Sequence, residues 1–269
     1  MSARKREVGK KSAAQLLAID IGNTNATLGF FRGNRLARRW EVASDVRRTP
    51  DEYAIVLQNL LCEPRGPKLR PTACFISSVV PPLSVAWEKA VWKTTGLGAM
   101  HLTSELDLGL RNLYENPAEV GADRLANAVG GKFLFGAPLV IVDFGTATTF
   151  DFVSPKGDYL GGIIMPGMEM SAEALFRGTS KLPLVSIEKP QCVIGRTTIQ
   201  SMRSGLFHGF IAAIDGLLEK SFDELGEKWQ AVATGGLGEL IAPESRYLKT
   251  AEPNLTLIGM REIWKRNRG

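Results

Sequence analysis

The chain has 269 residues, 44% of them hydrophobic and 23% charged, which excludes a disordered or fibrous protein and leaves room for one large domain or two small ones. Its apolar runs are far shorter than the roughly 20 residues of a membrane helix, and its 3 cysteines and 2 histidines provide neither a disulfide framework nor a zinc cage. The net charge of +5 comes from the two ends, residues 1–11 and 261–269, so we expect neither a nucleic-acid groove across the body nor a membrane partner.

The N-terminal half begins with a basic segment, residues 1–15, that we expect to be a disordered leader. The apolar stretch behind it is interrupted by Gln15 and Asp20, which is not typical of a secretory signal and indicates a cytoplasmic protein. Periodicity and turn residues then predict a run of strands and helices. The expected elements are strands over 16–21, 26–31 and 36–42, a helix over 51–61, a strand over 74–80 and a helix over 83–94.

The C-terminal half starts in the same way, with an apolar strand over 138–143, a turn over 144–148 and a strand over 149–153. Asp20 to Asn25 and Asp143 to Thr148 share the order Asp, apolar, Gly, polar, any residue, polar. Two such turns, each after a buried strand and before a second one, indicate an internal repeat. The later expected elements are a helix over 198–221, a strand over 230–233 that ends in Thr234-Gly235-Gly236, and a C-terminal helix after Leu255.

The repeated turn has the residue types that bind phosphate. A carboxylate at the end of a buried strand can hold hydrated Mg²⁺, which takes one or two carboxylates together with substrate phosphates. The glycine lets backbone N–H groups approach a phosphate closely, and the hydroxyl and amide side chains that follow can donate hydrogen bonds to it. The third turn, Gly235-Gly236, leaves room for a nucleoside to lie against the backbone. Each of these turns taken alone is more common as an ordinary hairpin.

Together the three turns resemble the phosphate 1, phosphate 2 and adenosine segments of the acetate and sugar kinase, chaperone and actin superfamily. The resemblance implies an α/β protein with a duplicated ribonuclease H-like (actin-like ATPase) fold, in which two mixed five-stranded sheets are flanked by helices. The halves are expected over 16–130 and 131–269, with a hinge near 125–137 and the active site in an interdomain cleft. The sequence has no Walker A motif, dinucleotide-binding glycine motif or protein-kinase catalytic loop.

Within that superfamily, longer motifs resemble those of type III pantothenate kinases, in register from about Leu16 to Asn267. The resemblance implies ATP-dependent phosphorylation of the 4′-hydroxyl of pantothenate, the first step of coenzyme A biosynthesis. It also implies a homodimer that requires Mg²⁺ with ATP and a monovalent cation, K⁺ or NH₄⁺. The motifs that carry it are 20–25, Asn116-Pro117-Ala118-Glu119-Val120-Gly121-Ala122-Asp123-Arg124, 142–148, Tyr159-Leu160-Gly161-Gly162, Pro166-Gly167, Lys181-Leu182-Pro183 and 233–237.

The same resemblance assigns a role to individual residues. Asp123 is implied as the catalytic carboxylate, and Asp20 as a Mg²⁺ ligand through water or phosphate. Asp143 is implied as the ligand of the monovalent cation, although a carboxylate there could equally serve the water shell of Mg²⁺. The residues implied to bind pantothenate are Tyr114, Gly121, Ala122, Asp123, Arg124 and Thr198. Those implied to bind ATP are Asp20, Ile21, Gly22, Asn23, Thr24, Asn25, Ala26, Thr27, Thr146, Gly235 and Gly236.

Chemical reasoning from the residues agrees with these roles. Phosphoryl transfer depends mostly on positioning and charge neutralisation, and a carboxylate such as Asp123 can accept the proton of the alcohol. Arg124 can bind the carboxylate of the vitamin, although an ion pair with Glu119 or Asp123 is the structural alternative. Tyr114 is equally compatible with packing, and Thr198 with the N-cap of a helix.

Three other functions are alternatives. A metal-dependent nuclease of the same fold needs a tight acidic cluster and a basic substrate face, which the slightly acidic body of the chain does not provide. A non-catalytic nucleotide-binding regulator is less compatible with the retention of Asp20, Asp123 and Asp143. A kinase for another small alcohol would share the same motif geometry. Release of ADP that depends on pantothenate discriminates among these functions.

Overall fold

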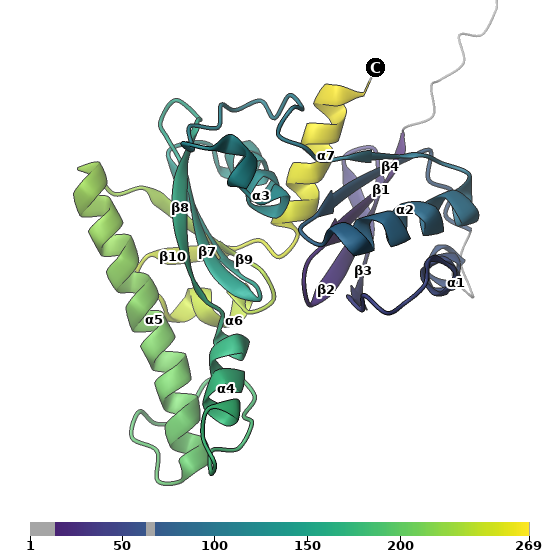
Figure 1. Ribbon diagram of the computed structural model, residues 1–269. Coiled ribbons are helices and arrows are strands. Elements are labelled where there is room, and N and C mark those ends of the chain that lie inside the picture. Colours follow the sequence, from purple (N-terminus) through teal and green to yellow (C-terminus); the bar gives the residue numbers. More distant parts are fainter. Residues whose placement is uncertain (1–13, 63–67, 269) are drawn as a thin grey trace, which may run out of the picture. The chain divides into compact units, whose positions relative to one another are not determined.

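The computed structural model describes residues 14–62 and 68–268, and its contacts divide the chain into two compact units (Figure 1). The first unit runs to Ile76 and includes Val80–His101, and the second comprises Ser77–Val79 and the chain from Leu102 on. The leader expected over 1–15 lies outside the described residues for all but its last two positions. None of the helices in this described part is both long enough and apolar enough to span a membrane.

A mixed five-stranded sheet with the order β3-β2-β1-β4-β5 forms the first unit. Strands β1, β2 and β3 are antiparallel neighbours, and β4 pairs with β5 in parallel. Two helices pack against the sheet through a buried apolar cluster that includes Tyr53 and Trp87, whose ring centroids are 4.6 Å apart. The elements are β1 Gln15–Ile21, β2 Asn25–Arg32, β3 Arg35–Ala43, α1 Pro50–Leu61, β4 Ala73–Ser78, α2 Pro81–Thr95 and β5 Ala99–His101.

The second unit repeats this arrangement, because its sheet has the order β8-β7-β6-β9-β10. Strands β6, β7 and β8 are antiparallel, whereas β9 and β10 join in parallel. Successive side chains of β6 face opposite sides of the sheet, so Val140 and Val142 pack with α5 while Leu139 and Ile141 lie under α3. The elements are α3 Ala122–Phe135, β6 Leu139–Phe144, β7 Ala147–Val153, β8 Tyr159–Pro166, α4 Met168–Arg177, α5 Thr198–Leu225, β9 Gln230–Thr234, α6 Gly238–Ile241, β10 Leu248–Ala251 and α7 Leu255–Asn267, with 3₁₀ turns at Pro117–Glu119 and Ala242–Glu244.

The matching order of the two sheets confirms the expected α/β fold of two mixed five-stranded sheets flanked by helices. The predicted strands and helices are all present, with ends that differ by a few residues. The sequence pattern did not predict β5, β8, β10, α3, α4 or α6. Strands β5 and β10 and helix α6 are only three or four residues long, and β8 alternates exposed with partly buried positions around two glycines that weaken its strand pattern.

The segment 125–137, expected as the hinge, forms most of helix α3. This helix packs closely on α7: a Cβ added to Gly130 would lie 2.5 Å from the carbonyl oxygen of Leu255, and one added to Gly259 would lie 1.8 Å from that of Ala126. Helix α3 therefore belongs to the second compact unit, although the expected halves assign most of it to the first. The division into two compact units does not test whether the two repeated halves of the sequence meet near residue 130. That boundary stays a prediction.

Candidate active site

The first phosphate-type turn joins β1 to β2 in the first unit. The N–H of Gly22 donates to the carbonyl oxygen of Asn25 at 3.0 Å and closes the turn. Ser44, which follows β3, holds the turn from outside, since its hydroxyl donates to the Gly22 carbonyl at 2.7 Å and its N–H to the Thr24 carbonyl at 2.9 Å. Asn23, Thr24 and Asn25 are exposed. The turn therefore has a fixed backbone and side chains that can reach a ligand.

The second phosphate-type turn joins β6 to β7 in the second unit and repeats the first with one residue fewer. Phe144 pairs with Thr148 here, whereas Ile21 pairs with Ala26 in the first sheet. Gly145 and Thr146 are exposed at its tip. Gly167 packs against this tip so closely that an added Cβ would lie 2.2 Å from the Thr146 carbonyl oxygen. This contact explains the glycine of the Pro166-Gly167 motif, because a larger residue at position 167 would displace the turn.

The glycine turn after β9 lies at the same edge of the second sheet. Thr234 pairs with Asp143 across the two parallel strands. Gly235 has a φ of 81°, and a Cβ added to it would lie 2.4 Å from Asp143 Oδ1, so both its conformation and its surroundings require glycine. Gly236 is exposed and has no atom within 4 Å of an added Cβ. The structure thus brings Asp143, the Thr146 turn and the glycine turn together at the carboxyl ends of strands β6 and β9.

Asp123 lies in the first turn of α3, where Gly121 is the N-cap residue. Its Oδ1 accepts a hydrogen bond of 2.8 Å from the backbone N–H of Arg124. A Cβ added to Gly121 would lie 2.5 Å from the same oxygen, so this glycine leaves space for the carboxylate. Burial raises the pKa of Asp123 above its ordinary value, although the Arg124 amide and the Arg124 charge act in the opposite direction.

Arg124 takes neither of the two ion pairs that the sequence suggested. Its Nε donates to Oδ1 of Asp151 at 2.8 Å, and the guanidinium lies 6.0 Å from the ring centroid of Tyr159. Glu119 instead accepts from the side-chain amide of Asn116 at 2.9 Å. The partner is Asp151 because α3 crosses β7, whose side chains on this face point toward the helix. The expected contact with the carboxylate of the vitamin stays a prediction.

Asp143 is held by a hydrogen-bond relay that the sequence did not suggest. Its Oδ2 accepts from Nδ2 of Asn127 at 2.7 Å, and Oδ1 of that amide accepts from the hydroxyl of Thr256 on α7 at 2.7 Å. Burial raises the pKa of Asp143 to about 7; Asn127 opposes the shift, and the charges of Asp123 and Asp151 add to it. No cationic side chain in the described part of the chain forms an ion pair with Asp143.

This environment suits a bound cation of low charge. A buried carboxylate without a cationic neighbour is stabilised by a positive ion, which favours the charged form. Among residues 14–62 and 68–268, no group of three or more His, Cys, Asp or Glu side chains is placed to hold a metal ion. At Asp143 the described donor is a single carboxylate held by a neutral amide. Asp20, at the end of β1 beside the exposed first turn, fits an ion that is shared with phosphates.

Tyr114 and Arg124 come together over the start of β8. The segment before Tyr114 is attached to this strand, since the N–H of Leu113 donates to the Tyr159 carbonyl at 2.8 Å. The Tyr114 ring lies 3.6 Å from a Cβ added to Gly161, and its centroid is 6.5 Å from that of Tyr159. Tyr114, which the sequence left between packing and binding, thus lies against the same start of β8 as the Arg124 guanidinium.

Thr198 lies elsewhere in the second unit. The N-cap of α5 is Thr197, whose side chain accepts from the N–H of Gln200, so the expectation of Thr198 as N-cap is wrong by one residue. Thr198 is exposed and lines a groove of about 830 Å³ between α4 and the start of α5. Figure 1 shows this end of α5 beside α4, at the opposite end of the unit from α3. Within one chain, Thr198 is not brought to Asp123.

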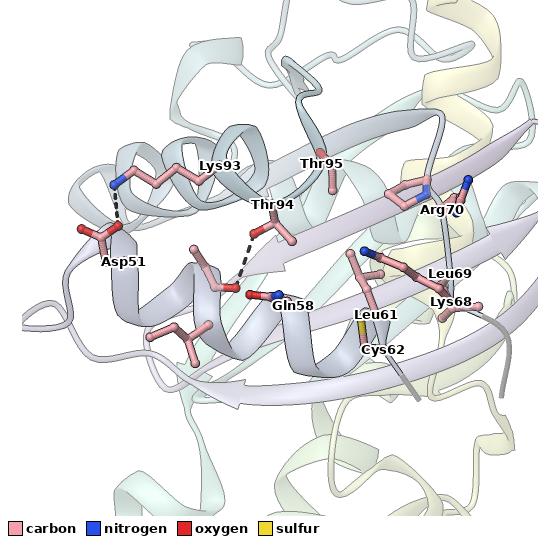
Figure 2. A pocket seen from close by; sticks show the side chains of 13 residues that line it. Asp51, Gln58, Leu61, Cys62, Lys68, Leu69, Arg70, Lys93, Thr94 and Thr95 are labelled. Atoms are coloured by element: carbon pink, nitrogen blue, oxygen red, sulfur yellow. Dashed lines mark hydrogen bonds and ion pairs between the residues drawn. The ribbon is translucent and has the colours of Figure 1, made fainter. Parts of the chain in front are cut away.

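A groove in the first unit involves none of the predicted site residues. Figure 2 shows it between α1, the end of α2 and the segment 68–71. Its volume is about 630 Å³. Its charged groups are not gathered at one point: Lys93 forms an ion pair with Asp51 at one end, and Lys68 extends from the other. We therefore do not interpret this groove as the active site.

The predicted site residues are divided between the two units. Asp20 to Thr27 lie in the first unit, and the remaining residues, from Tyr114 to Gly236, lie in the second. Sequence reasoning missed Asn127 and Asp151, and it gave Tyr159, which lies within a quoted motif, no role of its own. Asn127 carried a usable signal, because it follows Asp123 by four residues and so lies on the same face of α3. Asp151 carried none, since only the pairing of β7 with β8 and the crossing of α3 place it.

The two sheets of matching strand order give the chain the duplicated fold of actin-like ATPases. Two solved structures share the fold: a protein from Campylobacter jejuni described as a Baf family transcriptional activator (TM-score 0.58, 21% identity, 93% of this chain and 98% of that one) and the ethanolamine utilization protein EutJ from Carboxydothermus hydrogenoformans (TM-score 0.53, 14% identity, 91% and 88%). At these identities the likeness shows the fold alone.

The family of the chain follows from the sequence comparisons. The model of the family described as type III pantothenate kinase matches residues 16–220. Type III pantothenate kinases from Myxococcus xanthus and Geobacter sulfurreducens are 47% and 44% identical to this chain over 94% of its length, and the alignments cover 98% and 99% of those proteins. The chain belongs to the type III pantothenate kinase family. It is therefore an enzyme, a kinase that uses a nucleotide and a divalent metal.

Proposed function

We propose that Asp123 is the general base of this enzyme in the ATP-dependent phosphorylation of pantothenate, the first step of coenzyme A biosynthesis. The observation that carries the proposal is the half-buried Asp123 carboxylate, which is bonded to a backbone amide rather than to a cationic side chain. Such a carboxylate keeps lone pairs for an alcohol. Cytoplasmic action, expected from the sequence, is part of the same proposal.

In the proposed reaction, the 4′-hydroxyl oxygen of pantothenate bonds to the γ-phosphorus of ATP while the bond from that phosphorus to the β-phosphate bridging oxygen breaks. The hydroxyl proton passes to Asp123, and ADP leaves. The carboxylate also aligns the hydroxyl, and positioning of this kind is the main protein contribution to phosphoryl transfer. General-base assistance is typically worth roughly 10² to 10⁴ in rate.

ATP is proposed to bind on the exposed turns, with the phosphates near Asn23, Thr24 and Thr146. Asp20 would hold Mg²⁺ through water or phosphate, and Asp143 would hold a monovalent cation, K⁺ or NH₄⁺. These ions supply charge neutralisation for the phosphates when bound. The Asp143 assignment is supported by its half-buried position without a cationic side-chain partner in the described part of the chain, and by the Asn127 relay that orients it.

The nucleoside part of ATP is proposed to lie against Gly236, and this contact can be tested. Gly236→Ala is expected to raise the KM for ATP several-fold and to leave the thermal midpoint unchanged, because the space around an added Cβ is open in the free protein. Steady-state kinetics and a melting curve measure the two effects. Gly205→Ala, at another glycine with open surroundings, is the control. An unchanged KM for ATP in Gly236→Ala would remove this glycine from the nucleotide site.

Pantothenate is proposed to bind at Tyr114, at the Gly121-Ala122 turn and at Arg124, beside Asp123. The cation of Arg124 suits the carboxylate of the vitamin, and the edge that carries Nη1 makes no hydrogen bond within the described part of the chain. The product tests the acceptor: phosphorus NMR should find a single phosphomonoester on the 4′-oxygen of pantothenate. A product only with another small alcohol would favour the alternative kinase function.

A homodimer is proposed because one stretch of the second unit exposes many large apolar side chains. Monomeric proteins rarely expose so many large apolar side chains in one stretch of chain, and a second copy that covers them would remove them from water. Association would also give Thr198, which lies far from α3 in its own chain, a route to the pantothenate site of the partner. The exposed residues are Leu160, Ile164, Met170, Leu175, Phe176, Leu184, Val193, Ile194 and Ile199.

The dimer surface can be tested with charged substitutions. The double variant Ile194→Asp with Ile199→Asp is expected to shift the protein from dimer to monomer, because burying two carboxylates opposes association. Light scattering coupled to size-exclusion chromatography measures the mass. Ile55→Asp places the same change at a residue of the first unit that is 60% exposed, and it should leave the mass unchanged. A dimer that persists in the double variant would place the interface elsewhere.

A further inference from the structure

The guanidinium of Arg124 is fixed by groups that the proposed function does not use. Its side chain is 9% exposed, whereas that of Asp151 is 0% exposed. A small ligand can therefore reach Arg124 but not its partner. A charge that is removed from water to this degree requires a neighbour of opposite sign, and Asp151 provides it through Nε at 2.8 Å.

Asp151 is itself held from a second side. The hydroxyl of Tyr159, a fully buried residue, donates to Oδ1 of Asp151 at 2.8 Å, the same oxygen that accepts from Arg124 Nε. The hydroxyl of Thr149 lies 3.4 Å from the other carboxylate oxygen. The carboxylate consequently cannot rotate without losing a hydrogen bond in a place that water does not reach, which costs more than a bond at the surface.

The neighbouring strand is shaped to accept the guanidinium. Gly162 pairs with Asp151 across β7 and β8, and a Cβ added to it would lie 2.3 Å from Nη2 of Arg124. Nη2 also lies 3.5 Å from the carbonyl oxygen of Phe150. The Nε and Nη2 side of the group is thus directed at β7, so the terminal edge with Nη1 is the part left for a ligand.

We infer that Asp151 and Tyr159 are positioning residues that aim Arg124 at the carboxylate of the acceptor and so make the enzyme select an acid over its neutral analogues. The inference rests on the proposed role of Arg124 in binding pantothenate. Neither Asp151 nor Tyr159 touches the substrate in this account. Their effect is on the orientation of one cation, and it should therefore appear only with substrates that carry the anion.

The test compares pantothenate with its alcohol analogue, in which a CH₂OH group replaces the carboxylate. The KM for pantothenate and the inhibition constant of the alcohol in competition with pantothenate are measured for each variant, so the alcohol need not be phosphorylated. Tyr159→Phe removes one hydroxyl and is expected to raise the KM for pantothenate about 3- to 10-fold, as for a weakened hydrogen bond to a charged group. The inhibition constant of the alcohol and kcat should change less than about twofold.

A second variant and a control keep the outcomes distinct. Asp151→Asn keeps the size and one acceptor of the side chain but removes its charge, and it should have a larger effect of the same kind. Should it fail to fold because the Arg124 charge is left unpaired, Tyr159→Phe carries the test. Tyr53→Phe removes a tyrosine hydroxyl that is bonded to the backbone of Asp45 in the first unit, and it should change neither constant.

Arg124→Gln separates failure of this inference from failure of the proposed function. It is expected to raise the KM for pantothenate by more than about tenfold and to spare the alcohol. Equal effects of Arg124→Gln on acid and alcohol would overturn the role of Arg124 and the inference with it. Selective loss in Arg124→Gln, together with no change or equal changes for both ligands in Tyr159→Phe, would overturn the inference alone and leave a structural ion pair.

Discussion

Asp123→Asn is expected to lower kcat roughly 10²- to 10⁴-fold, which is the usual worth of a general base, while the fold is retained. The amide keeps the oxygen that accepts from the Arg124 N–H. It also removes a charge that burial disfavours, because the pKa of Asp123 is raised in the folded protein. At pH 7 the thermal midpoint should therefore stay the same or rise slightly. Steady-state kinetics and a melting curve measure both quantities.

The pH profile of kcat gives an independent check of the same residue. A base acts as its carboxylate, so the rate should fall as the pH falls through the pKa of Asp123. Because burial raises that pKa, the acid limb should lie above the range of an ordinary carboxyl. Asp223→Asn, at an exposed position of α5, is the matched control and should match the wild type. A kcat near the wild-type value in Asp123→Asn would exclude Asp123 as the base.

Gly259→Ala is expected to destabilise the protein by about 3 kcal/mol or more, since overpacking of a tight contact costs 1–3 kcal/mol and occasionally more. The added Cβ would lie 1.8 Å from the Ala126 carbonyl oxygen, and a backbone atom cannot move away as a flexible side chain can. Helices α3 and α7 would have to separate. For a chain of this size, a loss of 3 kcal/mol corresponds to a fall in the thermal midpoint of roughly 6–12 °C.

Gly216→Ala is the control for this substitution. Gly216 lies within α5, and no atom is within 4 Å of its added Cβ, so the higher helix propensity of alanine should stabilise the protein by about 0.5–1 kcal/mol. The two variants therefore shift the midpoint in opposite directions. A midpoint for Gly259→Ala that equals or exceeds the wild-type value would contradict the close packing of α3 on α7.

Local signals account for the parts of the fold that the sequence predicts. Helix α1 begins where Thr49 and Glu52 form a reciprocal capping box around Pro50, and all three residues lie within four consecutive positions. The repeated turns were visible because each sits between two apolar runs. Helix α3 was not predicted from the sequence; its Gly130 and Gly131 let α7 and β6 approach closely.

The candidate site was predictable where one short motif supplies the residues, as at Asp123 or at the Thr146 turn. It was not predictable where chain segments meet through the fold. The pairing of Arg124 with Asp151 depends on the crossing of α3 over β7, and the orientation of Asp143 depends on Thr256, a residue 129 positions from Asn127. Such contacts leave no periodic or spaced pattern in the sequence.

Pantothenate-dependent release of ADP tests the central claim most directly. The protein is incubated with ATP and Mg²⁺ in K⁺ buffer and in Na⁺ buffer, with and without pantothenate, and ADP is followed by a coupled assay. Release is expected to require pantothenate and to be faster in K⁺ than in Na⁺. Release that is equally fast without pantothenate, or no release from the folded protein under any of these conditions, would contradict the claim.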